Sequence, residues 1–484
     1  VENHGAWWMP DNKDALVVQL NQEQAATLSL DCKELFDDRQ WGREYKLTSE
    51  KGCVVVSFSK TNDAREAKGA EYQLFLAVAG VKEAKVMESW VERKHTETKE
   101  SRWVYQAAKL TFKNAVFAFA TKKSEAINTA KEVFEGRSRL FAQKQKRVSA
   151  LVRSFSVPGA CAAHAVDALR TTDGIVAGLP LLSEFQTRDE IVSIKALLLM
   201  NDVATAKKVL WRYLERVPFL TKSWSDKLPI ADGGWLFVRV LDLLKYLAET
   251  NSLAKVLSQK DIALIVAKLK KSVDVIFSEK MKDGLVTNKA RETWMDSASR
   301  PGARIEINAL ALAMLHAVHV LTGKPDGREL ALKSAVRRAF LRKTLVDTPG
   351  GIVRPNLFIA AYVYPNLLSK AEWITCFDVA LNELWLDWGG IATISTESPD
   401  KEGEHNGDSW FWLNHIAAIV LHRFDATRYK KHLDAIISAS STIQRWNGGF
   451  ICERSSSSKL TVDGCPAFLL SNATFLELVE EVKR

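Results

Sequence analysis

Residues 306–321 read EINALALAMLHAVHVL and decide the fold class of the larger part of this chain. Apolar side chains recur there at intervals of three and four residues, which is the spacing of one face of an α-helix. The stretch therefore predicts a helix whose apolar face packs on a protein core. The positions on that face are Ile307, Leu310, Ala311, Met314, Leu315, Val318 and Leu321.

The rest of the sequence from residue 158 onward has the same helical periodicity and predicts about a dozen helices. No sequence repeat of about 34 or 40 residues is present, so a solenoid is not expected. Helices paired antiparallel can instead close into a double ring with long loops at one end. Besides 306–321, the expected helices are 158–171, 189–200, 204–217, 234–249, 261–279, 328–342, 355–367, 370–386, 409–424, 429–445 and 467–483.

About the first 120 residues follow a different pattern. Short runs rich in Val, Phe and Leu are separated by polar turn clusters, which predicts strands of an antiparallel β-sandwich over residues 1–122. Residues 123–152 are rich in Ala, Lys, Glu and Arg and predict a linker helix, which leaves 153–484 as the helical domain. The expected strands are 15–20, 27–31, 52–59, 72–78, 103–112 and 115–120.

Composition and charge narrow the classes of protein to consider. The chain has 484 residues, of which 47% are hydrophobic and 26% charged, as in a globular protein of two or three domains. Its net charge of +9 could indicate nucleic-acid binding. The densest basic stretch, residues 144–153, is short, however, and no platform of aromatic and basic residues accompanies it. We therefore expect no nucleic-acid partner.

Neither a signal peptide nor a membrane span is visible in the sequence. The N-terminal residues VENHG are not a basic region followed by an apolar one, and no apolar run reaches the ~20 residues that span a bilayer. The six cysteines form no C-x-x-C pair, which is typical of free thiols in a reducing compartment, although Cys452 and Cys465 could bridge. We expect a cytoplasmic protein without a membrane partner.

Five predicted loops concentrate Asp, Glu, Trp, Arg and Gly, in a chain with 15 tryptophans. Each of these loops precedes or opens a helix. Glycoside hydrolysis needs one acid to protonate the leaving oxygen and a second group to activate water, and flat sugar faces pack well on indole rings. The composition therefore favours carbohydrate chemistry without singling out the carboxylates. The five loops are 178–190, 232–239, 292–308, 397–412 and 446–465.

Several motifs in these loops resemble one known family. TWMD at 293–296 stands in register with EINAL at 306–310, and HNGDSWFW occupies 405–412. Residues 178–190 and 451–480 are similar to further segments of the same family. Together they resemble the glucosidase domain of glycogen-debranching enzymes, the amylo-α-1,6-glucosidase family, in its archaeal-type and glucoamylase-like form.

The resemblance implies a mainly α protein, with an (α/α)6-barrel catalytic domain after the β-sandwich. It also implies an inverting glycosidase that releases terminal glucose from an α-glucan, with Asp296 as general acid and Glu453 as general base. The acid must be protonated, so we expect Asp296 to be desolvated beside Trp294 and Met295, with a raised pKa. We expect Glu453 in a more polar setting that keeps it ionised.

The resemblance further implies a set of substrate-binding residues around this pair. Taken alone, several of these residues could equally be helix caps, ion pairs or core side chains. Glu404 and Glu397 are rival candidates for the base. The implied substrate-binding residues are Arg188, Asp189, Asp232, Trp294, Glu306, Asn308, His405, Trp410 and Trp412.

No metal or organic cofactor is expected, because proton transfer and water attack need none and no ligand cluster with metal spacing is visible. His316 and His319 lie three residues apart on one predicted helix, a spacing that could bind a metal. The sequence offers no third ligand near them, so we interpret them as core histidines.

Two alternatives to a debranching glucosidase stay open. The first is a glucoamylase-like α-1,4-glucosidase or another inverting α-glucosidase, since a fold does not determine the linkage cleaved. The second is a glycan-binding relative without turnover. It is favoured by departures from the family pattern, such as Leu181 and Leu182 where the family has Trp and Phe, and Glu404 where it has Tyr.

Overall fold

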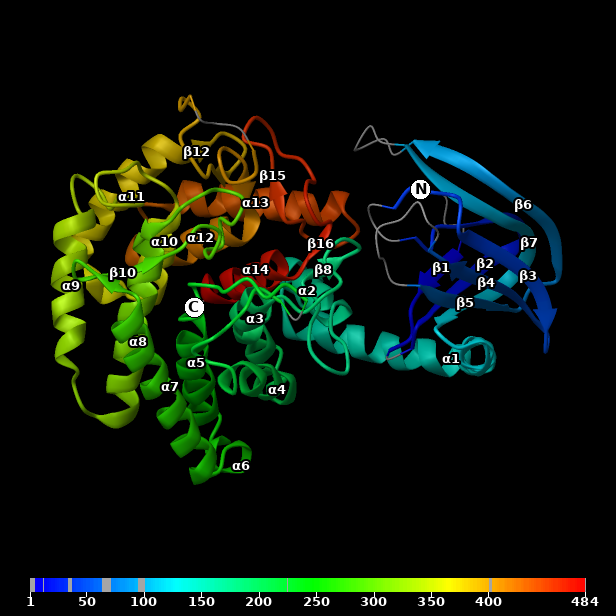
Figure 1. Cartoon of the computed structure of the whole chain (residues 1–484), viewed down its shortest axis with the longest axis horizontal. Coiled ribbons are helices and arrows are strands. Elements are labelled where there is room, and N and C mark those ends of the chain that lie inside the picture. Colours follow the sequence, from blue (N-terminus) through cyan, green and yellow to red (C-terminus); the bar gives the residue numbers. More distant parts are fainter. Residues whose placement is uncertain are drawn as a thin grey trace. The chain divides into compact units, whose positions relative to one another are not determined.

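The computed structural model describes residues 5–11, 13–33, 37–62, 71–94, 101–223, 225–399 and 403–483. The chain divides into two units that make most of their contacts internally, Val1–Ala150 and Leu151–Arg484. Each unit has its own hydrophobic core. The protein is mainly helical, and the N-terminal part of its sequence forms an antiparallel sheet (Figure 1).

The first unit is built on one seven-stranded antiparallel sheet in the order β1-β2-β7-β5-β4-β3, with β6 also paired to β7. The second half of the long strand β7 pairs with β5, while its first half pairs with β6. The strands are β1 (Gly5–Trp8), β2 (Ala15–Leu30), β3 (Arg43–Glu50), β4 (Cys53–Lys60), β5 (Tyr72–Ala79), β6 (Glu83–Lys94) and β7 (Ser101–Ala120).

The two faces of this sheet cover separate cores. On one face, Tyr45 of β3 stacks on Tyr105 of β7 with ring centroids 4.4 Å apart and meets Trp90 of β6 edge-on at 5.5 Å. Strands from both ends of the sheet therefore meet across an enclosed core. The other face is covered by helix α1 (Lys123–Ser154), whose buried residues lie in its first third. That part of the expected linker helix thus completes the core of the sheet unit.

In the second unit, six helices contact one another in a closed circuit: α3, α5, α8, α10, α12, α14 and back to α3. The other long helices pack on the outside of these six. Helix α2 contacts α14, and α4 contacts both α3 and α5. Helices α7 and α9 contact α8, while α11 and α13 contact α12. The helices are α2 (Val157–Ala168), α3 (Thr187–Leu199), α4 (Val203–Leu214), α5 (Trp235–Glu249), α6 (Leu253–Val256), α7 (Gln259–Glu279), α8 (Ile305–Thr322), α9 (Gly327–Phe340), α10 (Asn356–Val363), α11 (Lys370–Leu384), α12 (Phe411–Asp425), α13 (Lys430–Trp446) and α14 (Leu469–Glu481).

Short strands tie together the segments between these helices. They pair β8 with β16, β9 and β11 with β10, β12 with β13, and β14 with β15. These strands are β8 (Gly178–Leu179), β9 (Met281–Lys282), β10 (Leu285–Asn288), β11 (Gly302–Ala303), β12 (Trp385–Leu386), β13 (Gly390–Ile391), β14 (Ser409–Trp410), β15 (Arg454–Ser455) and β16 (Ala467–Phe468).

Helix α8 is apolar on nearly every side and is long enough to cross a membrane by composition, but 67% of it is buried inside the protein. A helix that is hydrophobic all round suits the interior of a large helical unit. The sequence pattern predicted only one apolar face, because it could not show that other helices surround α8. All six cysteines are free thiols, including Cys452 and Cys465.

Candidate active site

The residues singled out in the sequence lie where the chain enters the six central helices. Arg188 and Asp189 occupy the first turn of α3, and Asp232 lies just before α5. Asp296 lies in the long segment before α8, and Glu453 in the segment before α14. Loop residues held by rigid helices are common positions for binding and catalytic groups.

A buried ion pair joins two of these entry segments. Nε of Arg188 donates to Oδ2 of Asp232 at 2.5 Å, and their side chains are only 13% and 3% exposed. Burial acts to lower the pKa of Arg188, but the negative charges of Asp232 and Asp296 outweigh it and raise this pKa. The second oxygen of Asp232 is buried and has no hydrogen-bond partner among the described residues. Oδ1 of Asp232 can therefore accept a hydrogen bond from a hydroxyl group of a substrate.

Asp296 is held by a residue that the sequence motifs did not indicate. Nζ of Lys222 lies 2.6 Å from Oδ2 of Asp296, and the Lys222 side chain is 34% exposed. Burial alone would raise the pKa of Asp296, but Lys222 and Arg188 together lower it below its ordinary value. The expectation of a raised pKa was wrong, because the sequence does not reveal that Lys222, 74 positions earlier, reaches this carboxylate.

Glu453 has the opposite environment. Burial raises the pKa of this carboxyl, and the charges of Glu404 and Asp296 raise it further, against the N–H of Cys465 and the charge of Arg454. The Cys465 N–H donates to Oε2 of Glu453 at 2.9 Å. Glu453 is thus close enough to Asp296 to respond to its charge. The expected polar, ionising setting was wrong, since burial and neighbouring carboxylates dominate.

A third carboxyl lies in the same electrostatic environment. Asp189 is 7% exposed, and burial raises its pKa to about 7 against the charge of Arg188, with Glu453 adding to the rise. At neutral pH this group is therefore divided between its protonated and ionised forms. A half-protonated carboxyl can both donate and accept hydrogen bonds, which suits a group that holds sugar hydroxyls.

The backbone near Glu453 leaves room for its carboxyl because Gly464 has no side chain. Gly464 has a φ of +69°, and a Cβ placed there would lie 2.5 Å from Oε2 of Glu453. The left-handed backbone favours glycine, and the close approach leaves no room for a Cβ. Of the rival carboxylates, Glu404 pairs with Arg454 at 2.5 Å, and Glu397 is exposed.

The expected aromatic wall is a packed cluster. Trp294 meets Trp410 and Trp412 edge-on, with centroids 5.6 and 5.2 Å apart, and His405 stacks on Trp410 at 4.7 Å. These four side chains are at most 7% exposed, so the tryptophans mainly support the site. Burial lowers the pKa of His405 to about 4, which keeps it neutral. Its Nε2 is buried and has no hydrogen-bond partner among the described residues.

A buried network behind Trp294 fixes the segment that carries Asp296. Nε1 of Trp294 donates to Asn356, whose amide donates to Asp347, both at 2.7 Å. Arg300 pairs with Asp347 at 2.5 Å and with Glu306 at 2.9 Å. Burial raises the pKa of Glu306 against the charge of Arg300. Sequence reasoning missed Arg300, although it lies between the two motifs, because its partners are distant in the chain.

Asn308 has a structural role in place of the expected substrate contact. Its side chain is fully buried, accepts a hydrogen bond from the N–H of Val286 and donates to the carbonyls of Val286 and Arg304, all at 2.9 Å. These bonds use both ends of the amide. Asn308 therefore fastens β10, where the segment with Asp296 begins, onto α8.

Comparisons with known proteins agree with this architecture. A bacterial glucoamylase complexed with acarbose aligns with 99% of this chain and 86% of its own length, with a TM-score of 0.62 and 12% identity. A GH63 mannosylglycerate hydrolase from Thermus thermophilus has a TM-score of 0.53 and 9% identity over 68% of this chain and 100% of its own. A wild-type glycosidase has a TM-score of 0.50 and 14% identity over 69% of this chain and 98% of its own. No curated protein sequence matches.

This fold, with carboxylates gathered where the chain enters the central helices, is the fold of glucoamylase-type glycoside hydrolases. The family model described as amylo-alpha-1,6-glucosidase matches residues 164–477. The chain belongs to the amylo-alpha-1,6-glucosidase family. The matched region contains Arg188, Asp296 and Glu453 but none of the N-terminal sheet.

Proposed function

We propose that this chain is an inverting glucosidase with an (α/α)6 barrel that removes α-1,6-linked terminal glucose from a branched α-glucan in the cytoplasm. One observation carries the proposal: Asp296 and Glu453, 157 positions apart in sequence, lie close enough for one charge to shift the pKa of the other. The buried pair of Arg188 and Asp232 lies beside them and suits the binding of sugar hydroxyls.

In the proposed reaction Asp296 gives its proton to the glycosidic oxygen as the bond to the anomeric carbon breaks. Glu453 removes a proton from a water molecule that attacks the same carbon from the opposite face, so the configuration inverts. The reaction consumes one water and needs no metal. Asp296 regains its proton and Glu453 loses its proton between turnovers.

The contact with Lys222 adds a step to this scheme. A general acid must be protonated, whereas Lys222 and Arg188 favour the ionised form of Asp296. The Lys222 side chain is one-third exposed, so its ammonium can exchange this contact for water. We infer that the leaving-group sugar displaces the Lys222 ammonium from Asp296, so that the carboxyl is protonated only when substrate is bound.

The test begins with a panel of branched limit dextrin, linear α-1,4-glucan and disaccharides, with the released sugar identified by NMR before it mutarotates. β-Glucose from the limit dextrin is expected, because inversion of an α-linkage yields the β-anomer. β-Glucose from α-1,4-glucan alone would indicate the glucoamylase-like activity instead. Release of α-glucose would exclude inversion.

Variants then assign the two roles. Asp296→Asn and Glu453→Gln should each lower kcat on glucan by about 10²–10⁴-fold with little change in binding. With α-glucosyl fluoride, whose leaving group needs no proton, Asp296→Asn should recover activity and Glu453→Gln should not. The opposite pattern would make Glu453 the general acid and Asp296 the general base. The pKa shifts without substrate favour that assignment, because they raise the pKa of Glu453 and lower the pKa of Asp296. The exposed Glu397→Gln serves as control.

A glycan-binding protein without turnover is the second candidate, and the Lys222–Asp296 contact favours it, because it opposes protonation of the acid. Calorimetric titration with glucose and with limit dextrin separates the two candidates. Binding of the glycan without release of sugar would support this alternative over hydrolysis. The affinity should then be the same in Asp296→Asn as in the wild type.

A further inference from the structure

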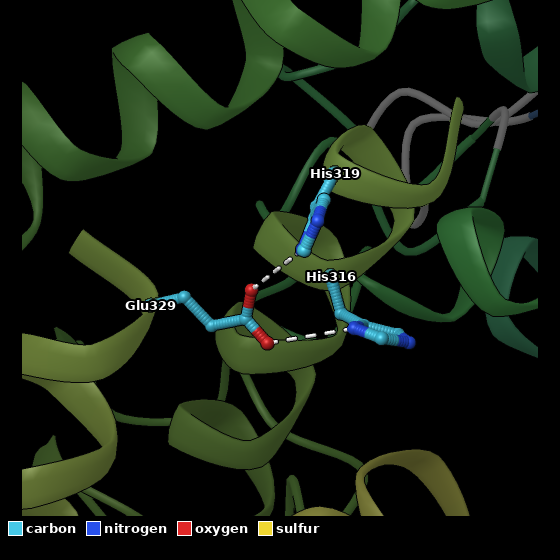
Figure 2. A group of neighbouring side chains, drawn as sticks. All are labelled: His316, His319 and Glu329. Atoms are coloured by element: carbon cyan, nitrogen blue, oxygen red, sulfur yellow. Dashed lines mark ion pairs between the residues drawn. The ribbon is translucent and has the colours of Figure 1, made fainter. Parts of the chain in front are cut away.

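Two histidines and a glutamate meet at the outer side of the helical unit, away from the candidate active site. His316 and His319 lie in the last two turns of α8, and Glu329 lies near the start of α9 (Figure 2). Glu306, by the active site, is in the first turn of α8, so about 20 Å of helix separates it from His319. The proposed reaction does not use this cluster.

The structure supplies the third ligand that the sequence did not show. Residues 323–326 reverse the chain, and α9 packs along α8, which brings Glu329 beside both histidines. The imidazoles are also about 40% exposed, so the interpretation of core histidines was wrong. Helix periodicity placed the two histidines on the apolar side of α8 but could not show that this part of the helix faces a groove.

The distances suit a bound ion better than direct hydrogen bonds. Nδ1 of His316 lies 3.4 Å from Oε1 of Glu329, and Nδ1 of His319 lies 3.8 Å from Oε2. Both separations exceed the 2.7–3.2 Å usual for N–H···O hydrogen bonds. A zinc ion held tetrahedrally at about 2.1 Å sets its ligand atoms roughly 3.4 Å apart. The three side chains can present ligand atoms that all lie within 4.8 Å of one another.

The carboxylate is oriented by a residue outside the cluster. The hydroxyl of Tyr364 donates to Oε1 of Glu329 at 2.7 Å. Hydrogen bonds of this kind to a ligating carboxylate fix its direction and support metal affinity. Glu329 therefore faces the two imidazoles without relying on a contact to either of them.

The cluster opens onto a groove of about 850 Å³, which leaves space for water on the side not occupied by protein. Two imidazoles and one carboxylate, with an open position, are a ligand set that zinc and similar divalent metals accept. Lys333 and Arg337 also line this groove. Arg337 is neutralised by Glu372, whose carboxylate lies 2.6 Å from it. Its charge is thus compensated within the groove.

We propose that His316, His319 and Glu329 bind one divalent transition-metal ion, with zinc as the best-suited metal and water completing its coordination. The ion joins the C-terminal half of α8 to the N-terminal half of α9. Its position points to a role in stabilising this helix pair, since it lies far along α8 from Asp296 and Glu453.

Isothermal titration of the EDTA-treated full chain with zinc chloride tests the site. One zinc ion per chain is expected, with at least tenfold weaker binding in Glu329→Gln and His319→Ala and an intermediate loss in Tyr364→Phe. The matched control is His432→Ala, a half-exposed histidine on α13, which should bind as the wild type does. Binding unchanged in Glu329→Gln and His319→Ala, or no saturable binding at all, overturns the proposal.

Two further measurements keep the result clear if a variant folds poorly. Cobalt(II) should give visible absorption bands in the wild type that Glu329→Gln loses, and zinc should raise the melting temperature of the wild type alone. Melting curves that zinc shifts equally in wild type and Glu329→Gln count against the site. Glycan hydrolysis should be the same in Glu329→Gln, so failure of the metal site and failure of the proposed glucosidase activity are distinct outcomes.

Discussion

Lys222 places a positive charge against the carboxyl that we propose as the proton donor. Its position is set by backbone hydrogen bonds, because the Lys222 carbonyl accepts from the N–H of Thr187 at 2.9 Å and its N–H donates to Leu228 at 2.8 Å. These bonds fix the backbone of Lys222 beside the start of α3, and the side chain extends from there to Asp296. This lysine, together with Arg188, thus favours the ionised form of Asp296 when no substrate is bound.

Replacing Lys222 by methionine should move the alkaline limb of the pH profile of kcat/KM to higher pH. The rate falls as pH rises through the pKa of the general acid, and Lys222 holds the pKa of Asp296 low. Without the ammonium this pKa rises, so the protonated form survives at higher pH. The profile is measured on limit dextrin between pH 4 and about 9.

Lys227→Met is the matched control, because Lys227 is exposed in the same segment. It should leave the profile unchanged. If Lys222→Met lowers kcat without moving the limb, Lys222 acts only on the local structure, and the displacement step in the proposed reaction is wrong.

At the scale of one element, α8 has two different ends. Asn308 in its first turn fastens β10 and with it the segment of Asp296, whereas His316 and His319 in its last turns form the proposed metal site. The same helix therefore serves catalysis at one end and stability at the other. Its continuous buried surface between them explains why it is apolar over 18 residues.

Asn308→Ala should lower the free energy of unfolding by about 3 kcal/mol, because it leaves the buried N–H and C=O of Val286 without partners. Urea denaturation followed by circular dichroism measures this change. The exposed Asn382→Ala on α11 should change stability by less than about 0.5 kcal/mol. Equal losses in both variants would contradict the fastening role of Asn308.

The elements differ in how well the sequence predicted them. Helical periodicity and strand patterns depend on neighbouring residues, so α8 and the positions of β2, β4, β5 and β7 could be anticipated, and the motifs located Asp296 and Glu453. The sequence pattern missed β1, β3 and β6. The pairing of Lys222 with Asp296 and of Glu329 with His316 depends on packing between distant segments. No local pattern encodes such contacts, which is why the pKa directions and the third metal ligand were missed.

For the whole molecule, each of the two units has its own core, so we expect two calorimetric unfolding transitions. The unit Leu151–Arg484 should absorb roughly twice the heat of the unit Val1–Ala150, in line with their lengths. Glucose should raise the midpoint of the larger transition alone, because a ligand stabilises the unit that binds it. Asp232→Asn should lose that shift, and a single transition that moves as one would contradict the expectation.

The glycine that makes room for Glu453 also has a consequence for inheritance. Any missense change at a glycine codon introduces a residue with a Cβ, and at Gly464 that carbon would lie 2.5 Å from the proposed base. The left-handed φ of +69° adds a second obstacle, most of all for β-branched replacements. In a population of cells that depends on this enzyme, selection should therefore remove every missense allele at this codon, whatever the chemistry of the new residue.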